Sequence, residues 1–469
     1  MKGQGLPPLT AGYASADITP PTPGLTLSGF AARCNQPSTG VHDPLSVRAL
    51  ALEQGDRAIL LLSFDLLAIG EPLAAEMEAG LDAALGSRFP RSARVLSCTH
   101  THSAPASIRL IGCGIEDPGY WELLARRASE TAAAAAGSMR EARVRWGAKD
   151  VPGRNFNRRI LLKDGRVVMA PHALDLVRKN GPGWDSFLFL RFDDASSGAP
   201  IAAVLNWAAH PATVCTSLVS GDYPAALCSA LEDREGIPFM FLQGACGDLS
   251  ATFGAMSFQD TAGVVGGVLD RLSPLPWKEA KGARIALASG AVPLAYGMQA
   301  PRSELEQMAG TMQEIARGRP GDPPAVRILE NILNVPPGGA ADPAMLRYIA
   351  SILAEWARQT AAAAGRATAP DLAVKVLSLG PMILAFVAAE VFVETAYTVR
   401  GLFARTACAV VGYCAPLVGY LPTDEALQEG GYEAEYAYRF YGHPAAYAAG
   451  SEQKLVAVVR ALATRLGVP

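Results

Sequence analysis

Histidine and carboxylate side chains stand directly after several runs that are typical of buried β-strands. The run ARVLSCTH leads to His100 and His102, IAAVLNWAAH ends on His210, and PMILAFVAAE ends on Glu390. Open α/β sheets bind their ligands at the carboxyl ends of strands. The chain has six histidines, and three of them occupy such positions. This convergence predicts a metal site at one edge of a sheet.

The chemistry of these residues favours zinc. Side chains two apart face the same way on an extended strand, so one metal could contact both His100 and His102. Alternatively, one histidine binds the metal while the other handles protons. Neutral imidazole suits zinc, which needs about three or four protein ligands and an open position for catalysis, and Glu390 offers an anionic ligand. Water on such a zinc becomes a nucleophile near neutral pH, which indicates a hydrolase.

Simpler explanations exist for each residue taken alone. A single histidine at a strand end is usually a structural hydrogen-bonding group, and Glu390 would be an ion-pairing or capping residue. Asp65 and Asp222 are expected to support the site or form turns. Ser250, which follows Gly247-Asp248, fits a turn or a helix N-cap. It lies outside any G-x-S-x-G elbow, so an ordinary serine hydrolase is not supported.

The elements that must position these residues alternate along the chain. Strand-like runs cover 57–65, 93–100, 201–210, 237–248, 381–390 and 406–413, and helix-like runs cover 71–85, 120–137, 223–236 and 263–272. The alternation predicts an α/β fold with a mixed, largely buried β-sheet core flanked by helices. We expect one catalytic domain over 1–469. Two long amphipathic helices with a proline-rich loop between them form an insertion or cap near 302–366.

Composition narrows the class of protein. Hydrophobic residues make up 50% of the 469 residues and charged residues 18%, so a well-buried core is expected and disorder is not. The net charge is -3 without a polybasic run, which argues against nucleic acid as a partner. No apolar run reaches about 18 residues, so no transmembrane segment is expected.

Location is predicted from the cysteines and the N-terminal stretch. The eight cysteines lack CxxC spacing, which indicates reduced thiols. The stretch MKGQGLPPLTAGYASADITP lacks a signal-peptide pattern. We therefore expect a cytoplasmic protein, or a secreted one if a signal peptide has been trimmed from this chain. A homo-oligomer is a candidate assembly, since soluble α/β enzymes of this size often form one.

Ten segments in this order resemble the neutral/alkaline (non-lysosomal) ceramidase family. They are ADITPP (16–21), GVHDPLSVRALAL (40–52), LLSFDLL (61–67), SCTHTHSAPA (97–106), NRR (157–159), LNWAAHPATV (205–214), SGDYPAAL (220–227), FLQGACGDLS (241–250), AAE (388–390) and GYLPTDEALQEGGYE (419–433). The resemblance implies one Zn²⁺ per chain, with His100, His210, Glu390 and Tyr420 as its ligands. Support for Tyr420 as a ligand comes from the resemblance alone.

The same resemblance implies four further active-site residues. His102 lies beside the metal as a proton-handling or oxyanion-stabilising group. Arg158 of NRR and Tyr432 of GGYE polarise the scissile carbonyl. Ser250 matches the serine that follows Gly-Asp in ceramidases, where it positions the substrate or attacks it.

The expected activity is zinc-dependent hydrolysis of an amide bond in an N-acylated amine. Ceramide is one candidate, which would place the protein in sphingolipid metabolism. Ceramidases typically carry a C-terminal immunoglobulin-like domain of about 100 residues, and only about 35 residues follow GGYE here, so we expect that domain to be absent. A shorter or more soluble amide is an equally strong candidate. Alternatives are an esterase or lactonase acting on a small substrate, a non-catalytic metal-binding protein, and catalysis by a Ser250 nucleophile.

Overall fold

The strands of the core are continuous apolar runs, as expected where both faces of a sheet are covered. In β4 (Arg57–Phe64) the last six residues are buried, and in β14 (Phe239–Gln243) all five are. The computed structural model describes residues 6–169, 176–252, 254–335, 339–403 and 406–468. Residues 1–5, within the stretch searched for a signal peptide, and 336–338, within the expected cap loop, lie outside the described residues.

The larger sheet is mixed, with β14 at one end of the strand order and β5 at the other. β14 pairs with β12 and β4 pairs with β5 in parallel, whereas the pairs between them are antiparallel. In spatial order the strands are β14, β12 (Pro200–Trp207), β11 (Ser186–Asp194), β6 (Arg140–Asp150), β1 (Leu9–Asp17), β3 (Ser46–Gln54), β4 and β5 (Arg94–Cys98), and β16 (Lys278–Glu279) also pairs with β6. Both parallel pairs therefore end near predicted site residues.

A second sheet contains four strands in the order β17-β18-β19-β21. These are β17 (Ile285–Pro293), β18 (Asp371–Leu379), β19 (Met382–Val387) and β21 (Ala407–Val411). Single bridges connect its β21 end to the larger sheet, from Cys414 to Ser97 and from Val411 to Gly244. The strand ends of both sheets thus meet in one region.

Small strand pairs complete the region around these ends. Their members are β2 (Gly40–Val41) with β13 (Leu218–Val219), β7 (Phe156–Asn157) with β15 (Leu249–Ser250), β20 (Glu390–Val391) with β22 (Tyr420–Leu421), and β8 (Ile160–Leu162) with β9 (Val167–Val168) and β10 (Val177–Asn180). Predicted site residues lie in several of these pairs, namely Glu390, Tyr420 and Ser250.

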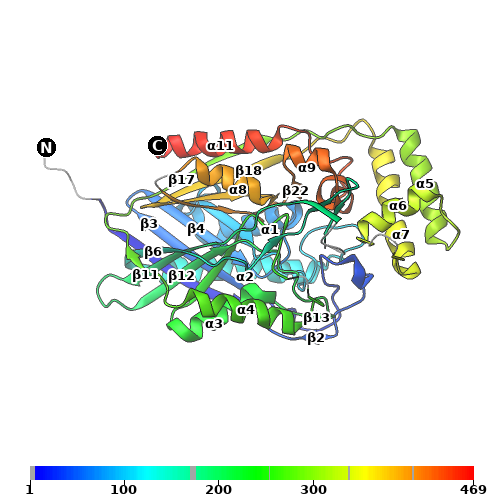
Figure 1. Ribbon diagram of the computed structural model, residues 1–469. Helices are drawn as coiled ribbons and strands as arrows, with labels where there is room; N and C mark the ends of the chain where they lie inside the picture. The colour runs from blue at the N-terminus through cyan, green and yellow to red at the C-terminus, as the bar shows by residue number, and fades with distance from the viewer. Residues whose placement is uncertain (1–5, 170–175, 253, 336–338, 404–405, 469) are drawn as a thin grey trace.

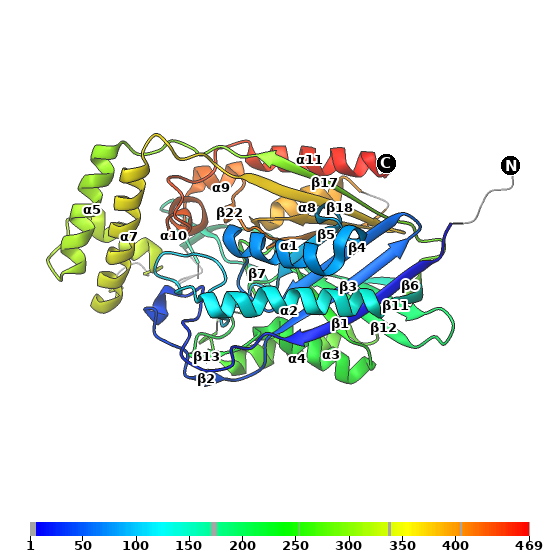
Figure 2. The same ribbon diagram turned by 180° about the vertical axis from the view of Figure 1, so that it is seen from behind.

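Helices cover the sheets, as Figures 1 and 2 show. α2 packs on β1 and β3, α3 on β14, α11 on β17 and β18, and α8 on β21. The helices of the core are α1 (Glu71–Leu85), α2 (Pro118–Gly137), α3 (Asp222–Glu235), α4 (Phe258–Leu272), α8 (Val393–Gly401), α9 (Asp424–Glu429), α10 (Ala437–Phe440) and α11 (Ser451–Arg465). The predicted fold class, a mixed sheet core flanked by helices, is confirmed.

The expected helical cap contains three helices instead of two. α5 (Arg302–Ala316) packs against α7 (Pro343–Ala363), and α6 (Pro323–Ile332) lies between them in sequence. The three stand together at one end of the molecule (Figure 1). The last two prolines of PGDPP, a segment that we expected to be part of the loop, begin α6. Asp322 caps the helix by accepting from the Ala325 N–H at 2.8 Å, and proline is tolerated in a first turn.

Among the described residues, no helix combines the length and apolar character that crossing a bilayer requires.

Candidate metal and active site

His100 and His102 follow β5, which pairs in parallel with β4, so both strands end at the same place. The strand stops at Cys98, and His100 has a left-handed backbone with φ +70°. Its N–H donates to the Leu66 carbonyl at 2.9 Å, which holds this uncommon conformation. The two rings approach to a centroid distance of 4.9 Å because of this turn, not because of strand alternation as predicted.

Three histidines form one buried group. His210 lies just beyond β12, and its Nε2 is 3.1 Å from Nε2 of His100 and 2.9 Å from Nε2 of His102. The ligand atoms of all three lie within 4.8 Å of one another. Nδ1 of His100 contacts the Leu67 carbonyl at 2.7 Å, and Nδ1 of His210 contacts the Cys246 carbonyl at 3.2 Å. Donation from Nδ1 leaves the Nε2 lone pairs facing one another, as in metal sites.

Burial and nearby charges favour the neutral form of the His102 and His210 rings. Burial lowers the pKa of His210 well below the usual range, and the charge of Arg158 lowers it further. Burial also lowers the pKa of His102, with smaller contributions from His100, Arg33 and Arg158. Neutral imidazole is the form that binds a transition metal. The donor set therefore fits a cation.

Glu390 adds an anionic oxygen to the group. It is the first residue of β20, which is separated from the end of β19 by two residues, and it is 1% exposed. Its Oε2 lies 3.3 Å from Nε2 of His100 and has no hydrogen-bond partner within the described residues. Its Oε1 accepts a hydrogen bond from the Tyr441 hydroxyl. A buried carboxylate oxygen without a donor is costly unless a cation compensates it, which is a second sign that the site fits a metal.

Tyr420 reaches the same region through strand pairing. β20 and β22 are parallel, and their register sets Glu390 opposite Tyr420. Nη2 of Arg158 donates to the Tyr420 hydroxyl at 3.0 Å. Burial and the charge of Glu390 hold the pKa of Tyr420 well above its usual range. Its role as a metal ligand stays a prediction.

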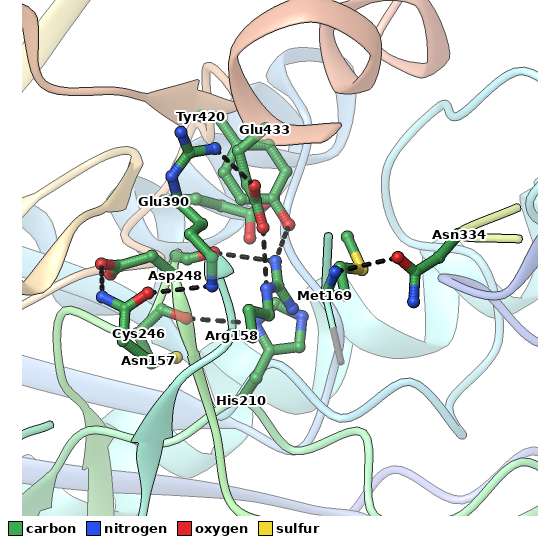
Figure 3. Close-up of polar contacts among 12 residues, drawn as sticks. Asn157, Arg158, Met169, His210, Cys246, Asp248, Asn334, Glu390, Tyr420 and Glu433 are labelled. Carbon is green, nitrogen blue, oxygen red and sulfur yellow. Dashed lines mark hydrogen bonds and ion pairs between the residues drawn. The ribbon is translucent and has the colours of Figure 1, made fainter. Parts of the chain in front are cut away.

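Arg158 is fixed by a buried ion-pair network (Figure 3). Its Nε donates to Glu433 at 2.8 Å, and its Nη2 also donates to the Gly247 carbonyl at 2.7 Å. The second oxygen of Glu433 accepts from Arg159 at 3.0 Å. Burial raises the pKa of Glu433, but both guanidinium groups outweigh this and hold it below its usual value. The network orients Arg158 towards the predicted ligand Tyr420.

Tyr432 and Ser250 lie at the margin of the group. Tyr432 opens a π-helical turn (Tyr432–Tyr436), its ring lies 6.3 Å from that of Tyr420, and burial raises its pKa. Ser250 forms a backbone bridge with His210. Within the described residues, however, no hydrogen bond joins the Ser250 hydroxyl to a histidine. The role of Ser250 in the site stays a prediction.

Three aspartates near the site, Asp65, Asp222 and Asp248, accept hydrogen bonds that stabilise the structure around it. Asp65 accepts from Arg48 at 2.9 Å, and Asp222 accepts from the Thr213 N–H at 3.0 Å. Asp248 accepts from Asn157 at 2.6 Å and from the Val393 N–H at 2.8 Å. The last pair of contacts ties the segment that carries Arg158 to the segment that follows Glu390.

Sequence reasoning missed three residues that support the site. The Tyr441 hydroxyl donates a hydrogen bond to Glu390. The centroid of the Tyr413 ring lies 4.0 Å from that of the His100 ring, and the Tyr413 hydroxyl accepts from the Cys246 thiol at 3.0 Å. Gly29 has φ +97°, and a Cβ there would lie 2.5 Å from Nδ1 of His102. Only the position of Tyr413 as the last residue of the strand-like run 406–413 offered a signal.

A buried histidine group at the strand ends of a mixed sheet is a kind of site that metal-dependent hydrolases use. The family model for the neutral/alkaline non-lysosomal ceramidase N-terminal region matches residues 9–261, which is more than half of the 469 residues. The chain belongs to this family, which supports a hydrolase. The matched region contains the three histidines, Arg158 and Ser250, whereas Glu390, Tyr420 and Tyr432 lie beyond it.

Two solved structures share the fold. The crystal structure of neutral ceramidase from Pseudomonas aeruginosa matches with a TM-score of 0.70 and 16% identity, covering 98% of this chain and 75% of that chain. A structure described as ceramidase complexed with C2 matches with a TM-score of 0.69 and 16% identity, covering 98% and 76%. The similarity of fold therefore extends over nearly the whole chain, including the part beyond residue 261.

Proposed function

We propose that this protein is a zinc-dependent amidohydrolase that cleaves the amide bond of an N-acylated amine, with one Zn²⁺ per chain. The observation that carries the proposal is the convergence of Nε2 of His100, Nε2 of His210 and Oε2 of Glu390 from three separate strand ends. Nδ1 of each of these two histidines contacts a backbone carbonyl oxygen. Oε2 of Glu390 has no hydrogen-bond donor within the described residues. These residues and Tyr420 would hold the ion.

Zinc in such a site polarises an acyl carbonyl and makes water a nucleophile near neutral pH. The protein's own groups supply the remaining chemistry. The neutral ring of His102 takes the proton released from the attacking water and delivers it to the leaving amine. Its position is supported by the 2.9 Å contact with His210.

Arg158 and Tyr432 stabilise the negative charge that develops on the carbonyl oxygen. Within the described residues, the hydrogen bonds of Arg158 to Glu433, Gly247 and Tyr420 use Nε and Nη2, and we propose that Nη1 donates to the substrate. Because Glu433 fixes the guanidinium before the substrate arrives, little reorganisation is needed during the reaction. Ser250, beside His210, is proposed to position the substrate.

Family membership favours a lipid amide as the substrate, and ceramide is one candidate. The same groups would act on an ester with a matching acyl part. We therefore compare kcat/KM for a panel of amides, each paired with the ester of the same acyl part, to determine which bond is preferred. Higher kcat/KM values on the amides support the proposal, and cleavage of the esters alone contradicts it.

The metal requirement is tested on the purified chain. We expect about one zinc per chain by elemental analysis, loss of hydrolysis after chelation, and recovery when zinc is added. His210→Ala should lose both zinc and activity. His42→Ala is the matched control, because His42 is a half-exposed histidine that stacks on Phe258 outside the site. A protein without tightly bound metal, or a fully active His210→Ala variant, would overturn the proposal.

A further inference from the structure

A hollow of about 650 Å³ lies where the two sheets meet α11. Its walls are the start of β4, the segment 87–93 before β5, the start of β17 and the C-terminal end of α11. Figures 1 and 2 place that end of α11 at the opposite end of the molecule from α5, α6 and α7. The described lining contains no residue of the proposed metal site, so the hollow is a separate feature.

Four arginine side chains line the hollow, one from each wall: Arg57, Arg88, Arg284 and Arg465. Arg88 is paired, because its guanidinium donates to both carboxylate oxygens of Glu53, at 2.6 and 3.1 Å. Within the described residues, the guanidinium groups of the other three have neither an ion-pair partner nor a hydrogen-bond acceptor. The described lining contains one carboxylate, that of the exposed Asp56. Positive charge is therefore in excess in the hollow.

This local excess contrasts with the net charge of -3 of the whole chain. Several other exposed arginines have a carboxylate beside them, as Arg126 has Glu130 at 3.0 Å and Arg302 has Glu306 at 2.8 Å. Like charges gathered in one hollow repel one another and attract an anion, whose binding relieves the repulsion. The hollow is therefore suited to a negatively charged ligand.

The lining favours phosphate groups as the source of that negative charge. A guanidinium donates two parallel hydrogen bonds to a phosphate, which gives geometric specificity as well as charge compensation. Ser87 and Ser92 also line the hollow, and their hydroxyls are further donors. The volume of about 650 Å³ falls within the range of about 300–1,000 Å³ typical of small-molecule sites. A single phosphate ion would fill only a small part of it, so a ligand with several phosphate groups fits better.

The surroundings of the hollow favour a soluble ligand over a membrane. Proteins that lie on a bilayer insert large apolar side chains beside their basic groups. The large hydrophobic side chains that are exposed among the described residues all lie outside this lining. The described lining also lacks an aromatic ring that would stack on a nucleotide base. Recognition would therefore depend on the phosphate groups themselves.

We propose that this hollow binds a soluble small molecule that carries two or more phosphate groups, with Arg57, Arg284 and Arg465 as the residues that bind them. The inference assigns a second binding site to the protein. It does not depend on the hydrolysis proposed for the first site, because none of these arginines belongs to that site.

Inorganic triphosphate is the probe, titrated into the full purified chain in a calorimeter. We expect one triphosphate per chain and a Kd that rises with added sodium chloride, because the contacts are ionic. The double variant Arg284→Gln and Arg465→Gln should bind at least about tenfold more weakly, since hydrogen bonds between charged groups are strong. Arg302→Gln with Arg317→Gln is the matched control, because it removes the same charge from two exposed positions on the cap.

Two further measurements keep the test decisive. Triphosphate also binds zinc, so the titration is repeated on the metal-free chain, where we expect the same Kd. Thermal unfolding checks the fold of each variant. The single variant Arg465→Gln, exposed near the end of α11, should weaken binding several-fold and serves if the double variant is unstable.

No binding of triphosphate, equal binding by the double variant and its control, or binding that disappears with the metal would each overturn the inference. Vesicles of equal parts phosphatidylcholine and phosphatidylglycerol form the second arm. Sedimentation of the chain with these vesicles, without binding of triphosphate, would assign the arginines to an anionic membrane surface instead. Because no amide is present in any of these measurements, their outcome is independent of the proposed hydrolysis.

Discussion

Replacing Tyr441 by phenylalanine removes one hydroxyl from behind the proposed metal site. That hydroxyl donates to Oε1 of Glu390, while Oε2 of the same carboxylate lies 3.3 Å from His100. Hydrogen bonds to charged groups contribute about 1.5–3 kcal/mol. Loss of such a supporting contact typically weakens metal binding about 10- to 100-fold. We therefore expect Tyr441→Phe to lower zinc affinity by that factor, because the carboxylate loses the contact that aims Oε2 at the histidines.

The assay is competition for zinc against a chromophoric chelator, with thermal unfolding of the metal-free protein as a check of the fold. Tyr447→Phe is the matched control, since this buried hydroxyl donates to the Val418 carbonyl at 2.7 Å and not to Glu390. We expect the control to retain wild-type zinc affinity. If Tyr441→Phe binds zinc within twofold of wild type, or if both variants weaken it equally, Tyr441 does not position Glu390.

Three further variants test other parts of the site. His102→Ala should keep one zinc per chain by elemental analysis yet lose at least about 100-fold in kcat, in line with removal of a proton-transfer group; loss of zinc would make His102 a ligand instead. Ser250→Ala should retain most activity, and a fluorophosphonate probe should not label the wild-type protein; labelling at Ser250 would favour a serine nucleophile. Glu433→Gln leaves Arg158 and Arg159 without their shared buried charge, so urea denaturation should show a loss of about 3–5 kcal/mol. Because pairing lowers the folded pKa of Glu433, this contribution is present above about pH 4.5 and is lost at lower pH. A variant with wild-type stability at neutral pH would contradict the buried-pair argument.

The α/β core and its strand-end histidines follow from the sequence because their signals are local. Runs such as 57–65 and 237–248 are apolar enough to predict strands buried on both faces, and the structure contains β4 and β14 there. The position of His210 just after such a run was enough to place it at a sheet edge. The same local signals misread PGDPP as a loop, because proline suits a turn and the first turn of a helix equally well.

The precise assembly of the site was decided by tertiary structure. Sequence spacing explained the approach of His100 and His102 by strand alternation, whereas a left-handed turn after β5 brings them together. Tyr441 and Gly29 act on Glu390 and His102 across 51 and 73 positions of sequence, so no local pattern could reveal either contact.

The order of apolar and polar residues along the chain determines that buried strands form and that metal-binding side chains follow them. Which of those side chains share one site depends on strand order and register. Glu390 stands beside Tyr420 because β20 and β22 pair in parallel, and it meets His100 because the two sheets join near β5 and β21. Both arrangements arise from contacts between residues far apart in the chain, and only the folded structure brings them together.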